Sequence, residues 1–138
     1  MATRVISVDQ STQSTKGFLF DGKGQVVGRA SRLHRQIYPR PGFVEHDPEE
    51  IYANTVEVIR ELVKNYGDDG SKYSISITNQ RETVVVWDKN SGKPVCNAVV
   101  WQCMRGEAIC NELKAAGCGE LFRSRSGLLI DPYFSGSG

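Results

Sequence analysis

Residues 47–67 constrain the fold most, because they carry a full set of helix signals after three strand-like runs. Asp47 can cap the helix, Pro48 suits its first turn, and Glu50 completes a capping box. Gly67 stands where a left-handed residue ends a helix. Seven residues recur at helical spacing and predict one buried face: Ile51, Thr55, Val58, Ile59, Leu62, Val63 and Tyr66.

Apolar runs before this helix predict three strands. Residues 5–8 and 18–20 each indicate a strand that is buried on at least one side. The sequence "DGKG" then turns the chain into a third strand at 25–33. We therefore expect an antiparallel meander of three strands, followed by an extended connection and the helix.

The rest of the chain predicts further strands and two more helices. Strands are expected at 73–78, 83–87 and 95–100, and helices at 105–116 and 120–126. The order βββαβ predicts an α/β fold, with a mixed sheet and helices on its faces. At 138 residues, of which 39% are hydrophobic, the chain suits one domain and is too short for two ordinary ones.

Charge and hydropathy exclude several classes of protein. Seventeen Lys and Arg against sixteen Asp and Glu give a net charge of +1, and no segment concentrates one sign. This balance argues against nucleic acid as the main partner, because binding phosphates needs a basic face. No apolar run approaches the roughly 20 residues of a membrane-spanning helix. We expect a cytoplasmic protein without a membrane span.

The four cysteines are predicted to be reduced and structural. They contain no CxxC pair, and only two histidines could supplement them as metal ligands. Cys103 and Cys110 are two helical turns apart, so we expect them to share one buried face.

The motif "DQSTQSTKG", residues 9–17, lies in the turn between the first two predicted strands. It offers a carboxylate, several hydroxyls and free backbone N–H groups, which suit phosphate oxygens and Mg²⁺. Asp9 can hold the metal directly or through its water molecules. The alternative is a polar hairpin tip, and neither the GxxxxGK[ST] nor the GxGxxG spacing is present.

A charged pair, Arg81 and Glu82, interrupts two predicted strands. In a tight connection the two side chains would leave the sheet together and could grip vicinal hydroxyls, which both donate and accept hydrogen bonds. The alternative is a surface ion pair of small energetic consequence. Trp101 could wall a pocket against the C–H side of a polyol, or belong to the core. Tyr133 offers a phenol, or anchors a loop.

Five strings together resemble the amino-terminal part of the FGGY carbohydrate kinases, and within that family most closely its glycerol kinase branch. They are "DQSTQSTKG", "YPRPGFVEHDPEEIY", "ITNQRETVVVWD", "GKPVCNAVVWQCMR" and "GLLIDPYFSG". The resemblance runs from about residue 5 to residue 136. It implies the actin-like ATPase fold, which is related to ribonuclease H and in which two such domains close over ATP and an acceptor.

The resemblance also implies roles for particular residues. Asp9 and Gln10 would lie at the magnesium and phosphate end of a cleft. Four residues would contact the nucleotide phosphates: Thr12, Gln13, Ser14 and Lys16. Four others would form the acceptor site, three on its hydroxyls and the indole on its carbon chain: Arg81, Glu82, Tyr133 and Trp101.

The departures of the first motif from the "DQGTTSSRA" that is usual in glycerol kinases include Ser11, Gln13, Lys16 and Gly17. The wording "TQSTK" is similar to xylulokinase-like members of the family. Glycerol, xylulose or another polyol or sugar therefore stays open as the acceptor.

The implied reaction transfers the γ-phosphoryl group of ATP to a primary hydroxyl of glycerol or a related polyol, with Mg²⁺. In the family, the catalytic base and the adenosine pocket lie beyond residue 138. We therefore expect an amino-terminal fragment, without the second kinase domain, that does not turn over ATP with glycerol by itself. Its parent would be a homo-oligomer. The alternative is a non-catalytic polyol-binding module.

Overall fold

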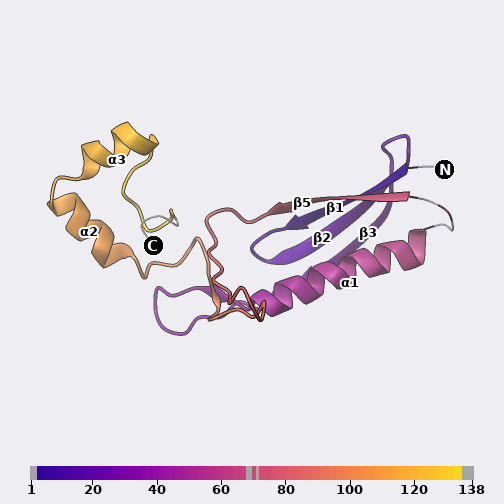
Figure 1. The fold of residues 1–138 in the computed structure, drawn as a ribbon, viewed down its shortest axis with the longest axis horizontal. Coiled ribbons are helices and arrows are strands. Elements are labelled where there is room, and N and C mark those ends of the chain that lie inside the picture. Colours follow the sequence, from indigo (N-terminus) through magenta and orange to yellow (C-terminus); the bar gives the residue numbers. More distant parts are fainter. Residues whose placement is uncertain (1–2, 68–69, 71, 135–138) are drawn as a thin grey trace. The chain divides into compact units, whose positions relative to one another are not determined.

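The computed structural model describes residues 3–67, 70 and 72–134, and its chain divides into two compact units (Figure 1). The first unit holds the residues up to Arg35 together with Asp47–Gln80. The second holds Gln36–His46 together with the residues from Arg81 onward. The end of the last quoted string, Ser135 and Gly136, lies outside the described residues.

The first unit is a mixed sheet with strand order β3-β2-β1-β5. Strands β1 (Thr3–Gln10), β2 (Ser14–Phe20) and β3 (Val26–Leu33) form the predicted antiparallel meander, which is confirmed. Strand β5 (Lys72–Asn79) pairs with β1 in parallel, so the predicted mixed sheet is also confirmed.

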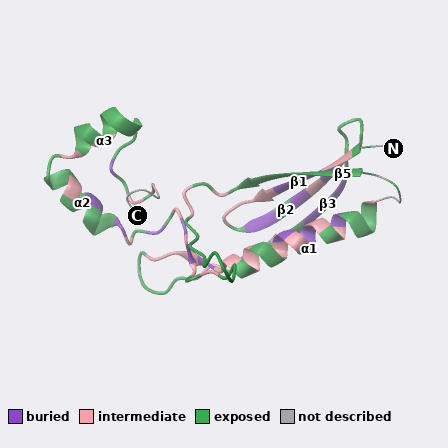
Figure 2. Ribbon diagram, in the orientation of Figure 1, coloured by how far each residue is buried: buried purple, intermediate pink, exposed green. Residues whose placement is uncertain are grey.

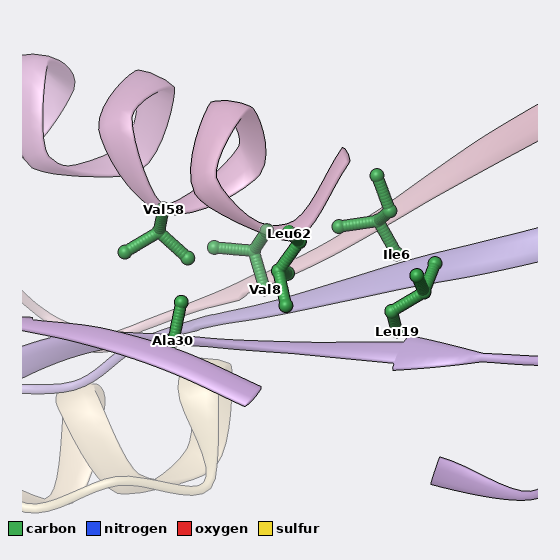
Figure 3. Packing of buried hydrophobic residues seen from close by; sticks show 6 residues of the cluster. All are labelled: Ile6, Val8, Leu19, Ala30, Val58 and Leu62. Carbon is green, nitrogen blue, oxygen red and sulfur yellow. The ribbon is translucent and has the colours of Figure 1, made fainter. Parts of the chain in front are cut away.

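Helix α1 (Pro48–Tyr66) covers one face of this sheet (Figure 1). Figure 2 shows the buried residues of this unit on β1, β2, β3 and the sheet-facing side of α1. Six side chains form the core shown in Figure 3: Ile6, Val8, Leu19, Ala30, Val58 and Leu62. All are at most 9% exposed, so their burial is the main stabilising contribution of this unit.

Two glycines let α1 lie close against the sheet. A Cβ atom at Gly17 would lie 2.3 Å from Cγ1 of Val58, and one at Gly28 would lie 2.5 Å from Cδ2 of Tyr66. Both distances are far shorter than a carbon–carbon contact. The helix therefore packs directly on the backbone of β2 and β3.

The ends of α1 agree with the prediction in position and differ in detail. Asp47 caps the helix and accepts hydrogen bonds from the N–H groups of Glu49 and Glu50. The carboxylate of Glu50 accepts from the N–H of Arg35 at 2.9 Å, so only the aspartate half of the predicted capping box forms.

The predicted left-handed terminator at Gly67 is wrong, because its φ is −71°. The glycine is required by space instead. A Cβ atom there would lie 2.2 Å from the carbonyl oxygen of Val63 and 2.6 Å from the hydroxyl of Tyr73.

The second unit has little regular structure. Strands β4 (Glu45–His46) and β6 (Ala98–Val99) pair antiparallel, and helices α2 (Glu107–Ala115) and α3 (Gly119–Ser126) follow. The two helices lie within two residues of their predicted bounds.

The strands predicted at 83–87 and 95–100 are wrong in extent. In the described residues, the first forms isolated bridges, from Val84 to Val99 and from Trp87 to Pro94, and the second keeps only β6. Residues 84–87 are 37–61% exposed, so their apolar side chains do not lie on a covered sheet face. A pattern rich in β-branched residues forms a strand only where a partner is available.

The cysteines are free, as predicted; Cys103 and Cys110 are buried, whereas Cys96 is exposed and does not fit the predicted structural role. The expectation that Cys103 and Cys110 share one helix face is wrong, because Cys103 precedes α2. Among the described residues, no group of His, Cys, Asp and Glu side chains could hold a metal with three ligands. No helix in the described part of the chain is long and apolar enough to cross a bilayer.

Candidate functional site

A polar row crosses one end of the sheet in the first unit. Asp9 pairs with Lys16 on β2 and with Thr78 on β5, and Lys16 pairs with Ser31 on β3. Paired residues on neighbouring strands point to the same face, and successive residues alternate. Because the adjacent residue Val8 is buried in the core under α1, the row lies on the opposite face. A carboxylate, an ammonium group and two hydroxyls are thus brought together.

Gln10 lies on the other face of β1. Its side-chain amide donates to the hydroxyl of Thr55 on α1 at 2.7 Å, and that hydroxyl donates to the carbonyl of Ile51 at 2.9 Å. The structure therefore ties Gln10 to the helix and does not place its side chain in the row with Asp9.

The 11–14 loop, which joins β1 to β2 and includes the first residue of β2, is a closed turn. The N–H and the hydroxyl of Ser11 both donate to the carbonyl oxygen of Ser14 at 2.9 Å. Gln13 is exposed, Thr12 is half-buried, and Ser14 is only 5% exposed. Of the predicted phosphate contacts, Gln13 and Lys16 present their side chains to solvent, whereas Ser14 points into the protein.

A buried histidine beneath this loop escaped the sequence reasoning. His34 is 6% exposed, and its ring lies between the hydroxyl of Thr15 and the amide of Asn54. The local sequence carries no clear signal for this burial, because Arg32, which has the same parity as His34, is charged and only partly buried.

Arg81 and Glu82 follow the end of β5 along the chain, in the second unit. Arg81 is exposed and Glu82 is half-buried. Among the described residues, Glu82 is the only non-glycine residue with positive φ, at 61°. Side chains other than glycine, asparagine and aspartate adopt this region at a cost, and such strain concentrates at functional sites.

Glu82 also lines a hollow of about 130 Å³ within the second unit. Its walls combine a carboxylate, a guanidinium group and a thiol with apolar side chains: Glu82, Cys103, Arg105, Val84, Val99, Val100 and Pro132. Few polar groups on an apolar wall are typical of small-ligand sites.

Two further predicted acceptor residues are in contact within this unit. The rings of Trp101 and Tyr133 lie 5.6 Å apart between centroids, at an interplanar angle of 65°. They follow Val100 and Pro132 in the chain, both of which line the hollow. The structure thus brings together Trp101 and Tyr133 and sets Glu82 at an adjacent hollow.

Arg105 is a second residue that the sequence reasoning missed as part of this site. Its Nη2 donates to Oε1 of Glu45, its Nε donates to Sγ of Cys103 at 3.0 Å, and its guanidinium lies over the ring of Phe43. Asn97 also donates to Glu45, at 2.9 Å. The hydrogen bonds from Arg105 and then Asn97 hold the pKa of Glu45 below its usual range.

The thiol of Cys103 is affected by the same arginine. Burial raises its pKa, but hydrogen bonds from Val44 and Arg105, with the positive charge of Arg105, outweigh burial and lower the pKa below 9.0. The hollow therefore contains a thiol that ionises more readily than an ordinary cysteine.

Comparison with known proteins gives a consistent result over the whole chain. Residues 4–138 match the N-terminal domain of the FGGY family of carbohydrate kinases. The chain is 54% identical over 134 residues to the glycerol kinase of Chromobacterium violaceum, and 53% identical over 134 residues to glycerol kinase 2 of Thermotoga maritima. Each match covers 96% of this chain and 27% of the relative.

A solved structure agrees with the sequence matches. The glycerol kinase of Plasmodium falciparum with ADP superposes with a TM-score of 0.90 at 38% identity, over 97% of this chain and 27% of that one. The expected actin-like ATPase fold, with an α/β mixed sheet, is confirmed. The chain spans about 27% of the length of these relatives, and it belongs to the FGGY family of carbohydrate kinases, within that family's amino-terminal domain.

Proposed function

We propose that the protein containing this chain is an ATP-dependent kinase that phosphorylates a primary hydroxyl of glycerol. The observation that carries the proposal is the identity of 49–54% to three glycerol kinases from two bacteria over nearly the whole chain. Xylulose is the competing acceptor, because the first motif is similar to that of xylulokinase-like members of the family.

The nucleotide would bind at the polar row of the first unit. Phosphoryl transfer is mostly positioning and charge neutralisation. Lys16 offers an exposed ammonium group for a phosphate oxygen, and the exposed side-chain amide of Gln13 offers a donor in the turn that precedes it. Gln10 would support this end through the helix, given its bond to Thr55.

Mg²⁺ fits Asp9 in one specific way. This ion keeps several of its waters and is often held by one or two carboxylates together with substrate phosphates. Asp9 is a single carboxylate on the open face, and the described residues supply no cluster of three ligands around it. Asp9 would therefore hold the ion directly or through water, and the ion would neutralise phosphate charge.

The acceptor would bind in the second unit. Arg81 and Glu82 supply donors and acceptors for vicinal hydroxyls. The strained backbone of Glu82 and its place in the wall of the hollow support this role. The contact between Trp101 and Tyr133 supports an aromatic wall with a phenol for the polyol.

The base that takes the acceptor's proton would lie outside this chain. Asp9 is assigned to the metal and Glu82 to a hydroxyl, so neither obviously serves as a general base. We therefore expect the chain alone not to release ADP from ATP with glycerol.

A use of ATP, together with four free cysteines, supports a cytoplasmic location.

A thermal-shift screen tests the acceptor site. Glycerol and xylulose are added to the native chain, to Arg81→Ala, and to Arg123→Ala, a control that removes an exposed arginine from α3 of the same unit. We expect glycerol to raise the Tm of the native and control chains and to leave Arg81→Ala unchanged. Equal shifts in all three chains would remove Arg81 from the site, and a shift with xylulose alone would reassign the acceptor.

A further inference from the structure

A buried polar cluster lies under the 11–14 loop of the first unit. The backbone N–H of His34 donates to the carbonyl of Gln13 at 2.8 Å, inside the loop. The Nε2 of the same histidine lies 3.2 Å from the hydroxyl of Thr15, which is fully buried. The backbone of His34 thus contacts the loop, and its ring contacts the start of β2.

The orientation of the Asn54 amide indicates which ring nitrogen of His34 carries the hydrogen. The side-chain nitrogen of Asn54 donates to the carbonyl of Leu33 at 3.1 Å, which sets the orientation of that amide. The same nitrogen lies 3.2 Å from Nδ1 of His34. Because an NH₂ group cannot accept, Nδ1 must be the acceptor and must lack a hydrogen. The single ring hydrogen is therefore on Nε2, facing Thr15, and the ring is neutral.

Protonation of Nδ1 would break this arrangement. An imidazolium ring would set an N–H group against the NH₂ group of Asn54, and two donors 3.2 Å apart repel each other. The ring would have to move, and with it the contacts to Thr15 and the loop.

We propose that neutral His34 is a positioning residue, which holds the 11–14 loop in the form that receives nucleotide phosphate, and that protonation of its ring releases the loop. That His34 holds the loop in place is argued from these contacts alone. That the loop receives phosphate rests on the proposed function. His34 does not touch the phosphate in this arrangement and acts through the backbone of Gln13 and the side chain of Thr15.

The surroundings of the ring support a neutral state near pH 7. Burial lowers the pKa of His34 below 6.5, while the charge of Glu50 and the carbonyl of Ser14 act in the opposite direction. Glu50 comes from α1 and shares its charge with Arg35, whose Nε lies 3.7 Å from it. Strand β2 presents Ser14 and Thr15, which do not titrate in this range. The loop should stay closed at neutral pH and open on acidification.

The native chain can be tested without any substitution. The ring nitrogens of both histidines and the amides of residues 11–14 are followed by NMR between pH 7.5 and 5. We expect a hydrogen on Nε2 of His34, a midpoint below 6.5, and loop amides that shift with that same midpoint. His46 is the internal control, because it is buried in the second unit and its Nε2 donates to Gln36.

A loop that stays unchanged while His34 titrates would overturn the proposal. A hydrogen found on Nδ1 at pH 7.5 would overturn it as well. Loop amides that shift with the midpoint of His46 instead would show that His34 does not control the loop, and would also overturn the proposal.

A variant reverses the electrostatics at the ring. Asn54→Asp places a carboxylate opposite Nδ1, which favours the imidazolium form and should raise the midpoint of His34 by about 1–3 pH units. The transition of the loop amides should move upward by the same amount. A loop transition that stays at the native midpoint would show that another group governs it. If the variant does not fold, the native titration decides alone.

ADP with Mg²⁺ tests the link to phosphate separately. At pH 7.5 the nucleotide should shift the amides of residues 11–14, and its affinity should fall about tenfold for each pH unit below the His34 midpoint, as one proton release requires. If the loop follows His34 but ADP leaves residues 11–14 unshifted, the positioning of the loop stands. The phosphate site of the proposed function is then wrong.

Discussion

Arg105 and Glu45 are 60 residues apart in the sequence and form an ion pair within the second unit. The side chains are 27% and 15% exposed, so the pair is largely protected from water. Glu45 also accepts from Asn97, and Arg105 donates to Cys103. This one pair therefore connects β4, the start of β6 and the wall of the hollow.

Glu45→Gln should destabilise the second unit by about 1–3 kcal/mol at pH 7, because it removes a charge-assisted hydrogen bond and leaves Arg105 without its anion. Urea unfolding followed by tryptophan fluorescence measures this unit, since Trp87 and Trp101 both belong to it. Glu120→Gln on α3 is the control and should change stability by less than about 0.5 kcal/mol. Equal effects of the two substitutions would contradict the role of the pair.

The same carboxylate predicts part of the acid dependence. The folded pKa of Glu45 is lowered, so its stabilisation is complete above the unfolded value of 4.5 and is lost as pH falls through the lower folded pKa. Unfolding free energies measured from pH 7 to pH 2 should fall less steeply in Glu45→Gln than in the native chain. Parallel curves would show that Glu45 does not titrate with a lowered pKa.

Cys103 should ionise below pH 9.0 in the native protein, because Val44 and Arg105 stabilise its thiolate more than burial opposes it. The unfolded chain then holds more protons just below that pH, so stability should rise with pH in that window. The Cβ chemical shift of Cys103 reports the titration. Cys103→Ser removes both effects, and a rise in stability that persists in the variant would have another source.

The backbone at Glu82 predicts a reversal of the usual preference for alanine over glycine. At φ of 61°, Glu82→Gly should be more stable than Glu82→Ala by about 1 kcal/mol, since only glycine adopts this region without cost. The neighbouring pair Arg81→Gly and Arg81→Ala is the control, because φ there is not positive. Denaturant unfolding that ranks both pairs alike would mean that Glu82 is not strained.

Gly17→Ala should destabilise the first unit by about 1–3 kcal/mol, because the new methyl group would overlap Val58 and Leu62 on α1. Far-UV circular dichroism during denaturant unfolding measures the loss. Gly22→Ala is the matched control, since its Cβ would lie 3.6 Å from the nearest atom, the carbonyl oxygen of Thr3. A native-like Gly17→Ala variant would show that α1 does not pack closely on β2.

Local signals predicted the first unit well. Asp47 and Pro48 marked the start of α1 and Gly67 its end, although Gly67 is not left-handed and the buried face is narrower than predicted, since Val63 and Tyr66 are 38% and 42% exposed. The "DGKG" turn fixed the hairpin in the same way, through Asp21, which accepts from the N–H groups of Lys23 and Gln25. Where structure is set within a few residues, the sequence suffices.

Structure set by distant partners was harder to predict. Residues 83–87 have the composition of a strand, yet their bridges depend on Val99 and Pro94. The φ of Glu82 is likewise a consequence of the surrounding chain. The orientation of Gln10 could have been predicted from the sequence. Gln10 lies two residues after Val8 on one strand, so both side chains face α1.

The candidate sites also differ in how far the local sequence predicts them. The pairing of Asp9 with Lys16 follows from one hairpin, and its polar row was foreseeable. The contact of Trp101 with Tyr133, and the approach of Arg105 to Glu45, join segments that no local rule relates.

The parallel pairing of β1 with β5 also sets an order of events during synthesis. Thr3 pairs with Lys72, so the first strand leaves the ribosome long before its parallel neighbour exists. At about 5–20 residues per second, the nascent meander waits several seconds with that flank of β1 exposed. Chaperone engagement with this emerging protein should therefore concentrate on β1 and end once residue 79 has cleared the exit tunnel.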